Sequence, residues 1–170
     1  WISGDKGRIV KDGFLIKGDG KTTKVIWTKK GADWTDYVVE FDVTIKNRQA
    51  GWLIRKSKNG YYMFLLRGPY LNRLVYNKKL FPCGKTPLSP PVTSDKKVHV
   101  KIEVVGNTIK HYIDGKLVDT LVDGTHNAGA FGFRQCGSES GLFANVAISE
   151  PDMKPAGAQS LGEGAVATAP

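Results

Sequence analysis

Residues 98–120 read VHVKIEVVGNTIKHYIDGKLVDT, and this stretch decides the fold class. Its first third alternates between apolar and polar residues, the pattern of a β-strand that buries one face and exposes the other. Two dipeptides, Gly106-Asn107 and Asp114-Gly115, supply residues that tolerate the positive φ of tight hairpin turns. The stretch therefore predicts a three-stranded antiparallel meander.

The same alternation recurs along most of the chain, whereas helical periodicity is nearly absent. We predict an all-β fold in which two antiparallel sheets pack as a jelly-roll sandwich. Strands are expected at residues 7–10, 14–17, 24–28, 37–46, 51–56, 61–67, 71–77, 97–105, 108–113, 116–120, 129–134 and 142–149. The expected core contains Val39, Phe41, Val43, Val100, Ile102, Val104, Phe131 and Phe133.

The length of 170 residues, 41% of them hydrophobic, fits one globular domain. Residues 1–150 are predicted to form this single β-sandwich domain. Residues 151–170 are rich in Ala, Gly and Pro, so we expect a flexible linker or tail. Residues 82–91 contain several prolines and are expected to form a long loop that crosses between the sheets. The chain starts at Trp1 without a signal-peptide pattern, which indicates a fragment of a longer or processed precursor.

The formal net charge of +9 attracts polyanions, but its lysines are spread over many predicted turns. Neither a basic recognition helix nor a nucleic-acid-binding motif is present, so no nucleic-acid partner is expected. No apolar run approaches the roughly 20 residues of a membrane-spanning helix, so no membrane partner is expected either. Cys83 and Cys136 could pair in an exported protein or remain two free thiols, and they lack the spacing of a metal site.

The meander quoted above, followed by GAFGFRQ and ESGLFANVAIS, resembles the concanavalin-A-like lectin/glucanase superfamily. Within it, the chain is similar to laminin-G-like and fructan-binding carbohydrate-binding modules of bacterial glycoside hydrolases. The upstream segments DYVVEFDVTI and GWLIRKSKNGYYMFLL look like the central strands of the same family. The resemblance implies a jelly roll that binds sugar on a sheet or at its edge loops, often beside a catalytic domain.

Glu40 and Asp42 lie two residues apart on a predicted strand, so both carboxylates share one face. Laminarinase-type enzymes of this superfamily carry a third acid three residues further on, where this chain has Ile45 on the opposite face. A retaining hydrolase needs two carboxylates about 5 Å apart. We therefore expect Asp42 to contact a ligand or to pair with a lysine, in preference to catalysis.

Two arginines are candidates for sugar recognition, because a guanidinium presents several donors in one plane. Arg55 ends an apolar strand in which Leu53 shares its face, and the resembling modules use an arginine in this strand to hold a terminal sugar. A salt bridge to Asp42 or Glu40 is the structural alternative. Arg134 is followed by Glu139, and together they could donate to and accept from neighbouring hydroxyls.

Aromatic rings could supply the flat surface on which sugar C–H groups pack. Trp34 lies in a polar predicted loop, and Tyr61 and Tyr62 begin a predicted strand, whereas Trp27 and Trp52 are expected in the core. A loop tryptophan can also act as a lid over the sandwich. We predict that Asp42, Arg55, Arg134 and Glu139 converge on one pocket beside Tyr61 or Tyr62, and we include Trp34 among the ligand-binding candidates.

The leading prediction is a non-catalytic carbohydrate-binding module, an accessory domain of a glycan-degrading enzyme that is secreted or at the cell surface. The expected partners are an oligo- or polysaccharide and other domains of the same polypeptide. One alternative is a small glycoside-hydrolase-like domain that uses Asp42, Glu40 or Glu139, and another is a laminin-G-like protein-interaction domain. No cofactor is expected, although loop residues such as Asp33, Asp36, Asp123 and Asn127 leave a structural calcium open.

Overall fold

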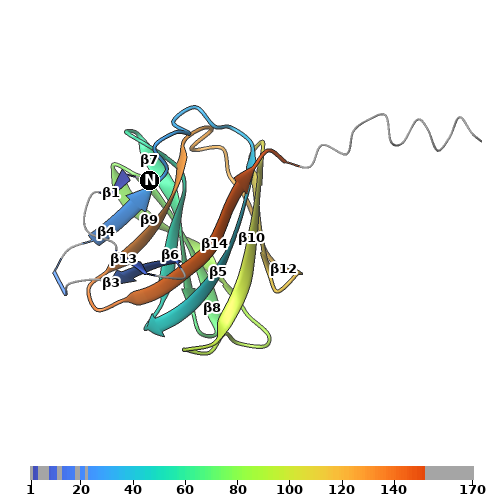
Figure 1. Cartoon of the computed structure of the whole chain (residues 1–170). Helices are drawn as coiled ribbons and strands as arrows, with labels where there is room; N and C mark the ends of the chain where they lie inside the picture. The colour runs from blue at the N-terminus through green and yellow to red at the C-terminus, as the bar shows by residue number, and fades with distance from the viewer. Residues whose placement is uncertain (1, 4–7, 11–12, 18–19, 22, 152–170) are drawn as a thin grey trace, which may run out of the picture.

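The computed structural model describes residues 2–3, 8–10, 13–17, 20–21 and 23–151. These residues form two seven-stranded antiparallel sheets packed face to face as a jelly-roll sandwich (Figure 1). Sheet A contains, in spatial order, β1 (Ile2–Ser3), β4 (Thr23–Trp27), β13 (Ala130–Cys136), β6 (Ala50–Ser57), β7 (Gly60–Arg67), β8 (Tyr70–Asn77) and β9 (Lys79–Pro87). Sheet B contains β12 (Lys116–Val122), β11 (Thr108–Ile113), β10 (Lys97–Val105), β5 (Tyr37–Asn47), β14 (Ser140–Ser149), β3 (Gly13–Lys17) and β2 (Arg8–Val10).

The predicted all-β class is confirmed, and so is the three-stranded meander, which forms β10, β11 and β12 at one side of sheet B. Both of its turns contain a residue with positive φ, Gly106 in the first and Asp114-Gly115 in the second. Among the described residues, no helix has the length and apolar character needed to cross a membrane. The predicted tail at residues 151–170 lies outside the described residues except for Pro151.

The inner faces of both sheets meet in one apolar core, and every residue predicted for that core is buried. Phe41 of β5 lies near its centre and makes edge-on contacts across the sandwich, with ring centroids 5.3 Å from Trp52 and 5.1 Å from Phe133. Edge-to-face packing of this kind favours one arrangement of the two sheets over others.

Strand β9 differs from the prediction, because residues 82–87 belong to an edge strand and not to a loop. Pro82 pairs opposite Leu74 and Pro87 opposite Tyr70, so both prolines lie on the one strand of this hairpin that has a free edge. A proline needs no ladder partner for its nitrogen at such an edge. The segment that crosses from sheet A to sheet B therefore starts after Pro87 and ends at Lys97, where β10 begins.

A second apolar cluster lies on the face of sheet A that is turned away from the core, called here the outer face. Leu53, Met63 and Leu65 form it, and each is buried although its neighbours in the strand point inward. Trp27 also lies outside the core, half-buried beneath the ammonium group of Lys56, which is 4.3 Å from its ring centroid. The prediction of Trp27 as a core residue is therefore wrong, whereas Trp52 is fully buried as expected.

Candidate functional site

Arg134 and Glu139 form an ion pair where β13 turns toward β14, with 2.9 Å between Arg134 Nη1 and Glu139 Oε2. Glu139 is held from two further sides, by the Cys136 backbone N–H at 2.8 Å and by the Gln49 side-chain amide. Among the described residues, no other side chain binds the Arg134 guanidinium, so its remaining N–H groups can donate to a ligand. About a tenth of each side chain is exposed, 12% for Arg134 and 10% for Glu139.

The Arg134 side chain lies flat over β6 because residue 51, beneath it, is glycine. A Cβ on Gly51 would lie 3.3 Å from Arg134 Cδ and 2.8 Å from a methyl carbon of Leu65. Arg134 follows the inward-facing Phe133 in its strand, so its side chain belongs to the outer face of sheet A. The guanidinium is therefore presented over the outer-face apolar cluster.

Tyr61 lies on the same outer face and is stacked on Tyr76, with ring centroids 5.0 Å apart and ring planes 13° apart. Burial and then the neighbouring Tyr76 raise the pKa of Tyr61, and the positive charge of Arg134 offsets part of this rise. Tyr61 therefore keeps its proton at neutral pH and can both donate and accept a hydrogen bond. We call Arg134, Glu139, Tyr61 and Tyr76 the outer-face site.

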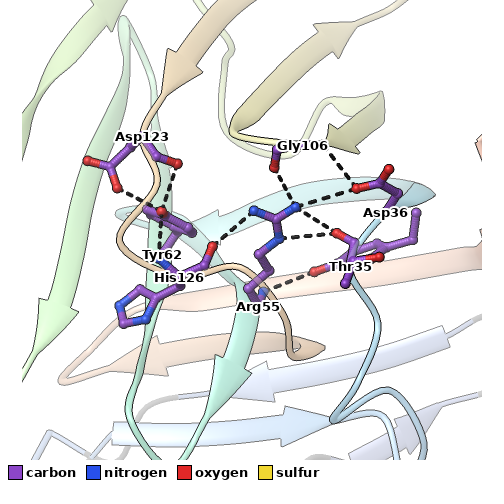
Figure 2. A network of polar contacts seen from close by, with 8 residues as sticks. Thr35, Asp36, Arg55, Tyr62, Gly106, Asp123 and His126 are labelled. Atoms are coloured by element: carbon purple, nitrogen blue, oxygen red, sulfur yellow. Dashed lines mark hydrogen bonds and ion pairs between the residues drawn. The ribbon is translucent and has the colours of Figure 1, made fainter.

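Arg55 does not join this site, and the prediction of one pocket shared by Arg55, Asp42 and Arg134 is wrong. The Arg55 side chain is 1% exposed and donates only to backbone carbonyls (Figure 2). Its donors reach Thr35 O at 2.7 and 3.2 Å, His126 O at 2.9 Å and Gly106 O at 2.6 Å. The structural alternative, a salt bridge to Asp42 or Glu40, is absent as well, and the nearest carboxylate among the described residues is Asp36 at 3.7 Å.

A β-bulge explains why strand alternation misplaced Arg55. The pairing of β6 with β7 shifts register between Ile54 and Ser57, and Arg55 has a φ of 53°. This left-handed conformation turns the side chain away from the face that Leu53 occupies and toward the loops at the end of the sandwich. Arg55 thus joins three loops from the inside.

Tyr62 also forms hydrogen bonds with these loops, and its side chain lies on the inner face of sheet A. Its hydroxyl donates to Asp123, with Oδ1 at 2.7 Å, and accepts the His126 backbone N–H at 3.0 Å (Figure 2). Burial first, then the Asp123 carboxylate, raise the pKa of Tyr62 to about 12. Of the two tyrosines predicted beside the pocket, only Tyr61 lies on the outer face.

Asp42 lies on the opposite surface of the molecule, the outward face of sheet B. Its carboxylate binds His99 Nδ1 at 2.9 Å and the Asn145 amide at 2.8 Å, and His99 Nε2 is 3.4 Å from Glu40. Partial burial opposes ionisation of Asp42, yet hydrogen bonds from His99 and Asn145 hold its pKa below its usual range. Asp42 and Glu40 thus form an ion-pair cluster around His99 and do not approach Glu139.

Trp34 occupies a further place, in the loop between β4 and β5. It lines a pocket of about 410 Å³ together with Asp33, Asp36 and Glu150. The residues predicted for one pocket therefore lie in three separate places: Arg134, Glu139 and Tyr61 on the outer face of sheet A, Arg55 and Tyr62 against the loops, and Asp42 on the outward face of sheet B. The sequence-based prediction missed Gly51 and Gln49, although a glycine inside a strand is a signal of close approach by a neighbouring group.

No group of three or more His, Cys, Asp or Glu side chains that could hold a metal occurs among the described residues. Both cysteines, Cys83 and Cys136, are unpaired thiols.

The amino-acid sequence of this domain matches one known protein family over nearly all of the described residues. The sequence profile of the 3-keto-alpha-glucoside-1,2-lyase-like domain matches residues 1–149. The chain belongs to this family. The matched range covers both sheets and contains the residues of the outer-face site and of the Trp34 loop.

Relatives of this lyase-like domain carry names from carbohydrate biology. The levanase of Bacillus subtilis (strain 168) is 28% identical over 152 residues, which are 85% of this chain but only 20% of the levanase. The fold matches the carbohydrate binding module CBM66 from Bacillus subtilis with a TM-score of 0.76 and 23% identity, over 88% of this chain and 95% of that one. It also matches sheep galectin-11 with a TM-score of 0.55 and 6% identity, over 76% and 98% of the two chains.

Proposed function

We propose that this domain is a non-catalytic carbohydrate-binding module that holds a neutral sugar at the outer-face site. The observation that carries the proposal is the Arg134–Glu139 pair, which lies across Gly51 on the face that also carries Tyr61. The guanidinium donates hydrogen bonds, the carboxylate and the Tyr61 hydroxyl accept them, and the stacked tyrosines offer an apolar ring surface.

Charge compensation favours a neutral sugar over a uronate. Glu139 neutralises Arg134 at 2.9 Å, so the site offers directional donors without a net positive charge. The names of the levanase and of the carbohydrate binding module that this chain resembles support the choice of a fructan as the first ligand to test.

The positions of the carboxylates argue for binding instead of hydrolysis by the residues considered from the sequence. Glycoside hydrolysis generally needs two carboxyl groups about 5–9.5 Å apart, on either side of the scissile bond. Glu139 lies at the outer face of sheet A, whereas Glu40 and Asp42 lie on the outward face of sheet B around His99. These residues do not form the required pair.

The chain spans one fifth of the levanase it resembles. We extend the proposal accordingly: the module acts beside other domains of one polypeptide, in a secreted or surface-located glycan-degrading enzyme, and it requires no cofactor.

Isothermal titration calorimetry with levan, inulin and polygalacturonate at low and high salt tests the proposal. Arg134→Ala should weaken fructan binding by about tenfold or more, because a charge-assisted hydrogen bond contributes about 1.5–3 kcal/mol. Arg134→Lys should recover only part of the affinity, since an ammonium group lacks the planar fork. Lys97→Ala is the control, because Lys97 is an exposed cation at the start of β10 in sheet B, away from the outer-face site.

Two outcomes would contradict the proposal. Equal affinity of Arg134→Ala and the wild type for every glycan would show that the outer-face site does not bind them. Binding to polygalacturonate alone, lost at high salt, would show that the net charge attracts a polyanion instead.

A further inference from the structure

A pocket of about 410 Å³ lies at the loop end of the sandwich, far from the outer-face site. It is formed by the start of β5 with the loop before it and by the end of β14. Its lining residues are Asp33, Trp34, Thr35, Asp36, Tyr37, Ile148, Ser149 and Glu150. This volume falls within the range of about 300–1,000 Å³ that is usual for small-ligand pockets.

Gly31 fixes the orientation of the Trp34 ring in this pocket. A Cβ on Gly31 would lie only 2.6 Å from two atoms of the indole, so the ring rests directly against the glycine backbone. Gly31 also has a φ of 109°, a conformation that L side chains rarely adopt. Trp34 is half-buried, with Tyr37 tilted against it at a centroid distance of 5.8 Å. The loop therefore presents an ordered aromatic wall.

The Arg55 network holds the polar side of the pocket in place. Asp36 Oδ1 accepts the Gly106 backbone N–H at 2.9 Å and lies 3.7 Å from Arg55 Nη2. The neighbouring Thr35 carbonyl receives two N–H groups of the same guanidinium (Figure 2). One carboxylate oxygen of Asp36 is thereby fixed by the protein, and the other can accept from a ligand.

The lining chemistry selects the class of ligand. Among the described residues that line it, the ionisable side chains at the opening are three carboxylates, Thr35 and Ser149 add hydroxyls, and there is no lysine, arginine or histidine. The Tyr37 hydroxyl is not available to a ligand, because it is buried and accepts the Arg55 backbone N–H at 2.9 Å. A uronate or a phosphate would be repelled, whereas a neutral sugar donates its hydroxyl protons to such acceptors and packs its C–H face on an indole.

We propose that the pocket beside Trp34 is a second sugar-binding site, which contacts another part of the polysaccharide held at the outer-face site. This proposal rests on the proposed function for the existence of a first site. Glu139 directly precedes β14 and Glu150 directly follows it, so the sites flank the two ends of a ten-residue strand, roughly 30 Å in length. A single sugar cannot touch both, but a polysaccharide can, and two linked contacts raise its apparent affinity.

NMR of the indole N–H groups tests this second site directly. Levan-derived fructo-oligosaccharides are titrated into the 15N-labelled wild type, Arg134→Ala and Trp34→Phe, the last of which assigns the Trp34 signal. The Trp34 signal should shift in the wild type and shift equally in Arg134→Ala, where the first site is disabled. The Trp52 signal should stay unchanged in both, because Trp52 is fully buried in the core.

Affinity for long levan chains provides a second readout. Trp34→Ala and Glu150→Gln should each lower the apparent affinity for the polymer by about tenfold or more, as expected when one of two linked contacts is lost. Their affinity for a single fructose unit at the outer-face site should stay at the wild-type value. Glu150→Gln should keep the fold even if Trp34→Ala does not, because Glu150 is exposed and follows the last strand.

The possible failures can be told apart. A Trp34 signal that stays unchanged while calorimetry still detects Arg134-dependent binding would overturn the second site and leave the proposed function intact. A Trp34 signal that moves with calcium and not with sugar would make the pocket a cation site, and release of reducing sugar lost in Glu150→Gln would make it catalytic. Absence of binding to any glycan would overturn both proposals.

Discussion

The stem of Arg134 passes directly over Gly51, and a Cβ at residue 51 would also lie 2.9 Å from the Arg134 carbonyl oxygen. Real Cβ atoms essentially never come this close to backbone atoms, so any larger residue at position 51 must move β13 or the arginine. The backbone of β6 therefore helps to orient a side chain of its neighbour strand.

Gly51→Ala should consequently destabilise the fold by about 1–3 kcal/mol, the usual effect of inserting a methyl group into a packed place. It should also weaken fructan binding, because the guanidinium is displaced from the outer-face site. Thermal unfolding and calorimetry measure the two effects. Gly124→Ala is the control, since a Cβ there would lie no nearer than 3.8 Å to any neighbour. Equal stability of both variants would refute the crowding argument.

Arg55→Ala should lower the free energy of unfolding more than any single substitution at the outer-face site. Three carbonyl groups, those of Thr35, Gly106 and His126, lose charge-assisted donors worth about 1.5–3 kcal/mol each, so the free energy of unfolding should fall by about 4.5 kcal/mol or more. Urea unfolding of Arg55→Ala measures this loss, with Arg67→Ala as control. A free energy of unfolding of Arg55→Ala close to that of the wild type would contradict the anchoring role of Arg55.

His99 and Asp42 should make stability depend on pH in two directions. The hydrogen bond with Asp42 raises the pKa of His99 above its ordinary value of 6.5, so this contribution is complete below pH 6.5 and is lost as pH rises through the raised pKa. The pKa of Asp42 is lowered from 3.8, so its contribution is present above that pH and is lost as pH falls further. NMR titration of His99 checks the first direction, and His99→Gln should remove that part of the pH dependence. A His99 pKa at or below 6.5 would be inconsistent with the ion-pair cluster.

His111 should destabilise the fold in acid. Burial lowers its pKa to about 3, with a smaller contribution from the charge of Arg73, and its Nε2 accepts the Trp52 indole N–H at 3.0 Å. Because the unfolded chain takes up a proton near pH 6.5, stability should fall as pH decreases from 6.5 toward 3. His111→Phe should flatten this acid limb but lower stability at neutral pH, since the Trp52 N–H loses its acceptor. Urea unfolding at several pH values measures both, and an unchanged acid limb in His111→Phe would contradict the prediction.

Short-range pattern was enough to predict most of the strands, the eight core residues named from it and the proximity of Arg134 to Glu139, but not strand β9 or the place of Trp27. Arg134 and Glu139 are five positions apart across one turn, so the local chain brings them together whatever the topology. In the same way, Val100, Ile102 and Val104 reveal their face through alternation alone.

The alternation of apolar and polar residues does not reveal that Asp42 and Arg55 lie far apart in the fold. β5 and β6 follow one another closely in the chain, yet they belong to different sheets, because the connection between Asn47 and Ala50 crosses the sandwich instead of closing a hairpin. A bulge then reversed the direction of Arg55 at a residue that is not glycine. Neither a crossing nor a bulge changes the apolar-polar pattern around it, so the sequence placed both side chains in one pocket.

The buried arginine has a consequence for how this domain could change its specificity. Arg55 donates to the main-chain carbonyls of Thr35 and His126, so these hydrogen bonds do not depend on which side chains the two residues carry. Residues in the loops that it joins can therefore be exchanged while the loop backbones stay anchored at the same points. A combinatorial library that randomises Asp33 beside Trp34, and Thr125 and Asn127 in the loop between β12 and β13, would vary the surface of these loops on an unaltered frame. The domain is in this respect a scaffold on which new recognition surfaces can be selected.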